Sequence, residues 1–328
     1  MQGIFTVSLD FELHWGVFDK KDRVDRASCY KNTIQLIPRL LDLFEEYEVH
    51  ATWATVGALF ANDRAEWETF KPSPLPGYTL GKYSAYKWVD QHGLPEDFYF
   101  AHFSPEAINM ILKSAGQELG THTFGHYYCL EQQDGFEAFD ADLKAAQKAA
   151  SKFNTKPVSL VFPRNQFNTE CLEICHNNGI KVVRSNPANW FWDPIADAKS
   201  QLLRKVFRTG DAYIPLGRRT SYPLSAIAAK KGEPLQLPAS RFLRPWSSKH
   251  PVANKLSLQR LLKELKTAAK HNECYHLWWH PENFGDYPEQ NIRNLIFVLE
   301  EYRKCKQKFG MTSWNIGEYV AQLNAQSN

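Results

Sequence analysis

The chain has 328 residues, of which 43% are hydrophobic and 23% charged, and its formal net charge at pH 7 is +3. This composition agrees with a soluble enzyme that has one large core or two smaller ones. The nearly balanced charge gives no indication of nucleic-acid binding. No stretch approaches the roughly 20 apolar residues of a membrane-spanning helix, so no integral membrane segment is expected.

Strand-like and helix-like segments alternate along the chain. Strands are predicted at 5–9, 50–55, 118–122, 158–162, 181–185, 274–280 and 310–312. Helices are predicted at 30–47, 105–114, 136–153, 169–178, 257–270 and 288–308. Repeated βα units imply an α/β fold with a parallel sheet, most simply closed as a barrel. Functional residues of such barrels gather at the carboxyl ends of the strands.

Two long stretches, 61–103 and 186–256, interrupt this repeat and are predicted to be inserted loops. Loops of such length are usually functional or form interaction surfaces. The second combines aromatic and basic side chains, namely Trp190, Phe191, Trp192, Arg218, Arg219, Arg241, Phe242, Arg244 and Trp246. Arginines with aromatic rings suit a phosphorylated or anionic glycan, although a solvated, salt-bridged loop agrees equally well with the pattern.

Two carboxylates follow the first predicted strand. Asp10 and Glu12 are two residues apart, so they point to the same face of an extended segment. One acid of such a pair can hold a metal while the other moves protons. The alternative is that both are solvated at a strand end.

Two histidines follow the third predicted strand. His122 and His126 are four residues apart, in a segment typical of a loop at a barrel rim. No Glu follows the first histidine, which excludes the zincin helix. Two histidines and Glu12 would form a three-ligand metal site with one open position. His14 is a reserve ligand, and a chance pairing of histidines is the alternative.

Two further strand ends carry polar residues. Arg164 follows an apolar run and can pair with a carboxylate, or else cap a strand at the surface. His280 ends the strand at 274–280 and could act as a general acid. His276, on the same face, is expected to be a hydrogen-bonded core residue.

These four segments, in this order, resemble the motifs of the polysaccharide deacetylases (carbohydrate esterase family 4, the NodB homology domain). The resemblance runs from about residue 5 to about residue 320. It implies one catalytic domain over 1–328, folded as a distorted (β/α)7 barrel. It also implies that Asp10 is the catalytic base, that Arg164 positions this base, and that His280 is the acid.

The sequence departs from the family pattern in two motifs. The common first motif has two adjacent Asp residues, whereas Phe11 separates Asp10 from Glu12 here. Some relatives that act on unusual amides and peptidoglycan have similar spacing. The third motif lacks the Arg-x-Pro-Tyr form, because Pro163 precedes Arg164. The backbone N–H of Asn165 is therefore the expected oxyanion donor.

The expected activity is that of a hydrolase that removes the N-acetyl group of an amino sugar. A divalent metal, zinc by expectation, would be held by Glu12, His122 and His126. Trp15 and Trp279 are expected to contact the sugar, with core packing as the alternative for any single Trp.

The sequence has no secretory signal and its six cysteines form no disulfide framework, so a cytoplasmic protein is expected. The expected substrate is a glycan precursor, nucleotide- or lipid-linked, or a surface-polysaccharide sugar. In the cytoplasm the protein would meet sugar nucleotides, lipid-linked sugars or small amides. Three alternatives remain open: an allantoinase-like amidohydrolase, a non-catalytic glycan-binding protein on the same fold, and a glycosidase. A glycosidase would need two acids facing each other across a sugar, and Glu282 and Asp286 are the only nearby candidates for a second acidic pair.

Overall fold

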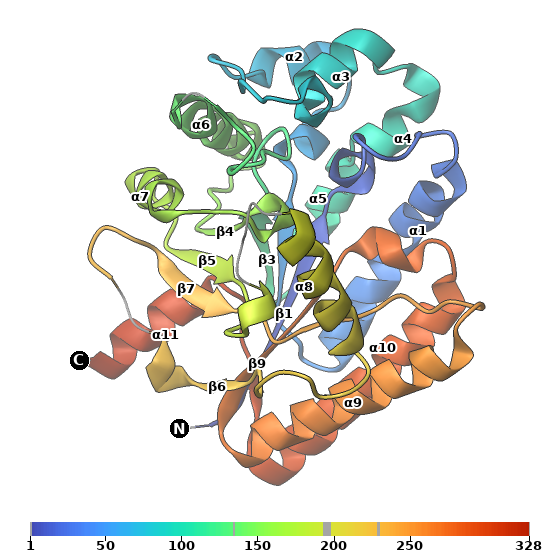
Figure 1. Ribbon diagram of the computed structural model, residues 1–328, viewed down its shortest axis with the longest axis vertical. Coiled ribbons are helices and arrows are strands. Elements are labelled where there is room, and N and C mark those ends of the chain that lie inside the picture. Colours follow the sequence, from blue (N-terminus) through green and yellow to red (C-terminus); the bar gives the residue numbers. More distant parts are fainter. Residues whose placement is uncertain (1, 134, 193–197, 228–229, 328) are drawn as a thin grey trace.

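The computed structural model describes residues 2–133, 135–192, 198–227 and 230–327, and its centre is one curled, mostly parallel sheet (Figure 1). Its strands are β1 (Ile4–Phe11), β2 (Ala51–Thr55), β3 (Gln117–Thr121), β4 (Ser159–Val161), β5 (Val182–Ser185), β6 (Tyr222–Pro223), β7 (Leu235–Pro238), β8 (Arg241–Phe242), β9 (Glu273–Trp279) and β10 (Thr312–Ser313). The order is β6-β9-β1-β2-β3-β4-β5-β7, while β8 pairs with β9 and β10 pairs with β1. Among these pairs only β6–β9 is antiparallel.

One short segment closes the curled sheet into a barrel. β7 pairs with β5. β8, which follows β7 after only two residues, pairs with β9. Between them, the N–H of Ala239 donates to Ser185 and the N–H of Ser240 donates to His276. The expected α/β fold, a distorted (β/α)7 barrel, is therefore confirmed. The closing segment lies within 186–256, so part of that predicted insertion is a barrel strand.

Helices cover the outside of the sheet, and their bounds follow the predicted ones closely (Figure 1). They are α1 (Ala27–Glu46), α2 (Arg64–Phe70), α3 (Ala85–His92), α4 (Tyr99–His102), α5 (Pro105–Lys113), α6 (Glu137–Ser151), α7 (Thr169–Asn177), α8 (Ala198–Gly210), α9 (Pro251–Lys270), α10 (Pro288–Phe309) and α11 (Glu318–Ser327). Helices α2, α3 and α4 occupy the stretch 61–103, which was expected to be a loop. Helix α9 begins six residues before the predicted start, because Pro251 suits the first helical turn.

Side chains of β1 separate the apolar core from a polar barrel interior. Phe5, Val7 and Leu9 belong to the main hydrophobic cluster, together with residues of α1 and α10. The alternate side chains point into the barrel, where Thr6 hydrogen-bonds Tyr319 and Ser8 hydrogen-bonds His276. Asp10 is the next residue on this inner face, so the polar interior leads directly to the site described below.

The described residues contain no helix that is both long enough and apolar enough to cross a membrane. All six cysteines are buried and free.

Helix α10 provides a test of the core assignment. Leu299 is fully buried in the main cluster, whereas Phe297, two residues earlier, is exposed. We expect Leu299→Ala to lower the free energy of unfolding by about 2–5 kcal/mol, because it leaves a cavity. The matched Phe297→Ala should change it by less than about 0.5 kcal/mol. Urea denaturation measures both, and equal losses would contradict the packing described.

Candidate metal centre and active site

Three side chains converge at the carboxyl ends of β1 and β3. Oε1 of Glu12 lies 2.8 Å from Nε2 of His122 and 3.3 Å from Nε2 of His126. All three residues are buried, and their ligand atoms lie within 4.8 Å of one another. Neither ring nitrogen of His122 has a hydrogen-bond partner of good geometry. A buried carboxylate and two imidazoles that converge in this way fit a divalent metal such as zinc, whose catalytic sites combine three protein ligands with a water or substrate.

The charges at this point favour an ionised carboxylate. Burial acts to raise the pKa of Glu12, but the charges of His280 and His126 and hydrogen bonds from the histidines hold it well below the usual value. Burial lowers the pKa of His126. An ionised carboxylate at Glu12 beside a neutral imidazole at His126 is the protonation state that a metal requires of these two ligands.

A buried acid holds each ligand segment in place. Asp142 of α6 accepts the backbone N–H groups of Phe124 and Gly125 and the hydroxyl of Tyr86. Burial raises the pKa of Asp142 to about 6, against the effect of these hydrogen bonds. Gly125 is required here, because a Cβ would lie 2.7 Å from the Tyr86 oxygen. The segment between His122 and His126 is thus a loop, as expected, with positive φ at Thr123 and His126.

Glu282 has the same role for the turn after β1. Its Oε1 accepts the backbone N–H groups of Glu12 and Leu13. Burial, reinforced by the Glu12 carboxylate, raises the pKa of Glu282 to about 8. Sequence reasoning named Glu282 only as a possible acid of a glycosidase.

Asp10 is held by Arg184, not by Arg164. Nη1 and Nη2 of Arg184 donate to the two carboxylate oxygens of Asp10 at 2.6 and 2.7 Å, and both side chains are buried. Arg184 also stacks on the ring of Trp278, 4.3 Å from its centroid. The sequence analysis missed Arg184. Its one signal is its place within the predicted strand at 181–185, because an arginine buried there needs a partner.

Arg164, expected to position Asp10, instead donates to Asp19 at 2.6 Å and lies 3.7 Å from the ring centre of Tyr128. The turn at Pro163–Asn165 directs its side chain away from Asp10, with φ of 57° at Arg164. The same turn corrects the expected oxyanion donor, because the backbone N–H of Asn165 already donates to Phe162. The Asn165 side chain instead accepts a hydrogen bond from Arg184.

His280 lies at the rim of the site. Its Nε2 is 3.6 Å from Oε1 of Glu12 and 3.8 Å from Oδ2 of Asp10, and its side chain is 29% exposed. It can therefore reach both a substrate and the two acids. Its inner neighbour His276 is fully buried and hydrogen-bonded to Ser8, as expected for a core residue.

The two tryptophans expected to contact substrate are core residues. Trp15 and Trp279 are both 0% exposed. Trp15 donates to the carbonyl of His102 and stacks on Trp67, and Trp279 stacks on Phe284. Side chains along β9 alternate between the inner and outer faces of the sheet. Trp279 points outward to the helices, so its expected contact with substrate was wrong.

The side chain that does face the site is Trp278, which lines the cavity with Asp10, Glu12, His126 and His280. It alternates with His276 and His280 on the inner face of β9, and this spacing could have identified it. His14, the reserve ligand, is buried away from the metal ligands and contacts the carbonyl of Lys21 and the ring of His102.

The family model described as polysaccharide deacetylase matches residues 25–183. This match confirms the similarity that the order of the motifs predicted. It includes the histidine pair, while Asp10, Glu12 and His280 lie outside the matched residues. A comparison with curated proteins found no match.

Solved structures show which fold the chain shares. A "putative polysaccharide deacetylase" from Mycobacterium smegmatis is 13% identical, with a TM-score of 0.61 over 100% of this chain and 92% of that one. The α-amylase AmyC from Thermotoga maritima is 11% identical, with a TM-score of 0.57 over 98% and 75%. PuuE allantoinase is 9% identical, with a TM-score of 0.56 over 98% and 89%. At such identities the likeness concerns the fold alone, so the activity has to be inferred from the site.

Gly16 offers a test of the metal centre. A Cβ on Gly16 would lie 1.6 Å from Oε2 of Glu12, so Gly16→Ala must displace the Glu12 carboxylate. We expect this variant to bind zinc at least about tenfold more weakly, measured by competition with a chelator. Gly81→Ala is the control, because its Cβ would meet only Lys87 at 3.6 Å. Equal zinc affinity in both variants would contradict Glu12 as a ligand.

Proposed function

We propose that this protein is a metal-dependent deacetylase that hydrolyses the N-acetyl amide of an amino sugar. The observation that carries the proposal is the convergence of two sets of groups at one cavity. One set, Glu12, His122 and His126, fits a metal. The other, the Asp10–Arg184 pair and His280, fits proton transfer. The similarity to polysaccharide deacetylases supports an amide of an acetylated sugar as the bond broken.

A metal bound by Glu12, His122 and His126 would supply Lewis-acid activation of water and carbonyl. Asp10 takes a proton from the attacking water as the water oxygen bonds to the acetyl carbon. Arg184 keeps Asp10 oriented through its two hydrogen bonds. His280 gives a proton to the sugar nitrogen as the C–N bond breaks. The products are acetate and a free amino sugar.

The substrate that we propose carries an anionic group, as in a nucleotide- or lipid-linked sugar. Next to the site cavity of about 390 Å³ lies a second one of about 180 Å³, and Trp278 and His280 line both. This space exceeds the needs of a small cyclic amide. The wall of the second cavity adds Trp192, Arg208 and Arg244, side chains that suit a phosphate and a stacked ring.

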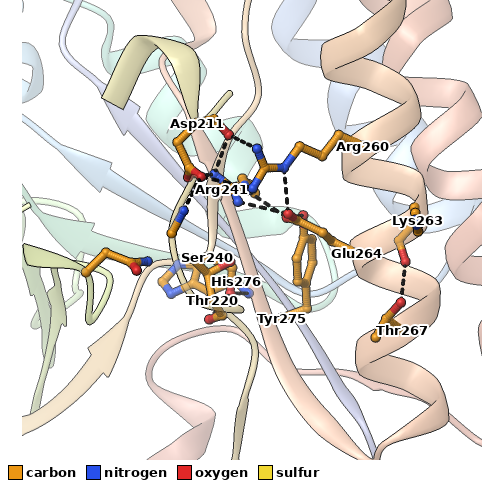
Figure 2. A network of polar contacts seen from close by, with 12 residues as sticks. Asp211, Thr220, Ser240, Arg241, Arg260, Lys263, Glu264, Thr267, Tyr275 and His276 are labelled. Carbon is orange, nitrogen blue, oxygen red and sulfur yellow. Dashed lines mark hydrogen bonds and ion pairs between the residues drawn. The ribbon is translucent and has the colours of Figure 1, made fainter. Parts of the chain in front are cut away.

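Two other arginines of this wall, Arg241 and Arg260, are neutralised by the acids Asp211 and Glu264 (Figure 2). Arg208 and Arg244 are therefore the arginines that we propose for a ligand. Arg241 and Arg260 each pair with both Asp211 and Glu264. Arg208 has no such acidic partner among the described residues, and its buried Nε makes no hydrogen bond. Arg244 faces only the ring of Tyr213, at 5.3 Å, among the interactions of the described chain.

A glycosidase agrees less well with the site. Of the three acids that line the cavity, Asp10 is paired with Arg184 and Glu12 with the histidines. Glu282 is directed at backbone N–H groups. All three acids are thus engaged with groups of the protein, whereas hydrolysis of a glycosidic bond requires two acids that face each other across the sugar.

Histidine variants test the proposed roles. His122→Ala should lose both zinc and acetate release, because it removes a ligand. His280→Ala should keep the zinc and the fold, since this side chain is partly exposed, and lose about 10²–10⁴-fold in kcat. His271→Ala, at an exposed position, is the control. Zinc is measured by elemental analysis, and acetate release from UDP-N-acetyl sugars and N-acetylglucosamine oligomers. An unchanged kcat in the His280→Ala variant would contradict the role of His280 as the general acid.

Arg244→Ala tests the anionic substrate. We expect KM for a UDP-N-acetyl sugar to rise about tenfold or more, because a charged hydrogen bond is lost, while KM for a neutral N-acetylglucosamine oligomer stays the same. Kinetic assays on both substrates measure this difference. Lys249→Ala, an exposed lysine of the same segment, is the control. An equal rise for both substrates would contradict a specific anion contact.

A further inference from the structure

The segment that forms one wall of the second cavity also carries an exposed apolar patch. Nearly half of the exposed large hydrophobic side chains in the described part of the chain lie between residues 190 and 216. We call them the α8 patch: Trp190, Leu202, Leu203, Val206, Ile214 and Leu216. Leu202 and Val206 are 66% and 60% exposed, far more than a core-facing helix would allow.

Helix α8 is amphipathic, but its apolar face is turned outward. Residues on a helix are about 100° apart, so Leu202, Leu203 and Val206 occupy one arc of about 100°. Outside this arc, Phe207 packs on Phe191, which is buried, and Arg208 lines the second cavity. Leu216 folds back onto the end of the helix, since a Cβ on Gly210 would lie 2.8 Å from its Cδ1. The patch is therefore continuous from the helix to the following turn.

Most charged residues in the described part of this segment, 202–219, are basic. Residues 202–219 hold five basic residues, Arg204, Lys205, Arg208, Arg218 and Arg219, of which Arg219 is paired with Glu273. The acidic residue of this stretch, Asp211, is buried and paired with Arg241 and Arg260. Lys205 and Arg218 are exposed. An apolar stripe flanked by basic residues is typical of a helix that lies in the interface of an anionic membrane, and less so of a protein contact, where lysine is depleted.

The position of the helix relates this surface to the site. Arg208 and Ala212, on its inner side, line the same cavity as Trp278 and His280. In Figure 1, α8 lies in front of the barrel strands, with its outer face free of other elements in that view. A surface that binds through the α8 patch would thus contact the protein beside the mouth of the catalytic cavity.

We propose that α8 docks the protein on the surface of an anionic lipid bilayer, with Leu202, Leu203 and Val206 inserted among the lipids and Lys205 and Arg218 at the headgroups. The docked protein would meet lipid-linked substrates at the mouth of its site. The docking itself does not depend on the proposed chemistry, so it can be tested without a substrate.

Co-sedimentation with vesicles tests this proposal on the full chain. The probes are phosphatidylcholine vesicles with and without about 30% phosphatidylglycerol. We expect binding to the anionic vesicles, weakened when NaCl rises from about 0.05 M to about 0.5 M. The triple variant Leu202→Ser, Leu203→Ser, Val206→Ser should bind at least about tenfold more weakly. The charge variant Lys205→Glu, Arg218→Glu should lose the preference for phosphatidylglycerol.

The control replaces three exposed apolar residues elsewhere, Val24→Ser, Leu80→Ser and Phe297→Ser, and should bind as the wild type does. Equal thermal stability of all variants would exclude loss of fold as the cause. Absence of vesicle binding by the wild type, or equal binding by the triple variant and the control, would overturn the proposal. So would sedimentation equilibrium that shows a dimer abolished by the triple variant, in the absence of vesicle binding, because the patch would then join two copies of the chain.

Discussion

The buried ion pair between Asp10 and Arg184 is the interaction on which the site depends. It joins β1 to β5 across the barrel interior, and Arg184 also contacts Ser8, Asn165 and Trp278. Removing one partner of such a pair leaves an uncompensated buried charge, at a cost of about 3–5 kcal/mol. The proposed catalytic base is therefore also a structural residue, and we expect a change at Asp10 to affect folding as well as the proposed proton transfer.

Two further buried acids hold the backbone beside the proposed metal ligands. Asp142 binds the backbone between His122 and His126, and Glu282 binds the backbone at Glu12. Burial raises the pKa of both carboxyls, to about 6 and about 8. Backbone conformations with positive φ surround the same point, at Leu13, Thr123, His126, Arg164 and Asn165. Such strain persists only where neighbouring contacts hold it, and it is concentrated at sites of chemistry.

Local sequence patterns predicted the features that depend on residue spacing along the chain. The alternating strands and helices, the barrel and the grouping of Glu12, His122 and His126 all follow from periodicity and from the common edge of parallel strands. The partner of Asp10 depends on which inward residue spans the barrel, and no local spacing distinguishes Arg184 from Arg164. The barrel-closing strand at 235–242 was missed because two very short strands give little periodic signal. Trp279 was wrongly expected at the site because the alternation of inward and outward side chains was not followed along β9.

The pairing of β1 also constrains the order in which the protein can fold during synthesis. β1 lies between β2 and β9, and Ile4 is paired with Cys274. When β5 leaves the ribosome, one edge of β1 still has no partner, and the strand that will close the barrel does not yet exist. Unpaired edges of this kind promote aggregation of nascent chains. His280 joins Asp10 and Glu12 only after β9 is in place, so the earliest strand to be synthesised is among the last to gain its full set of neighbours.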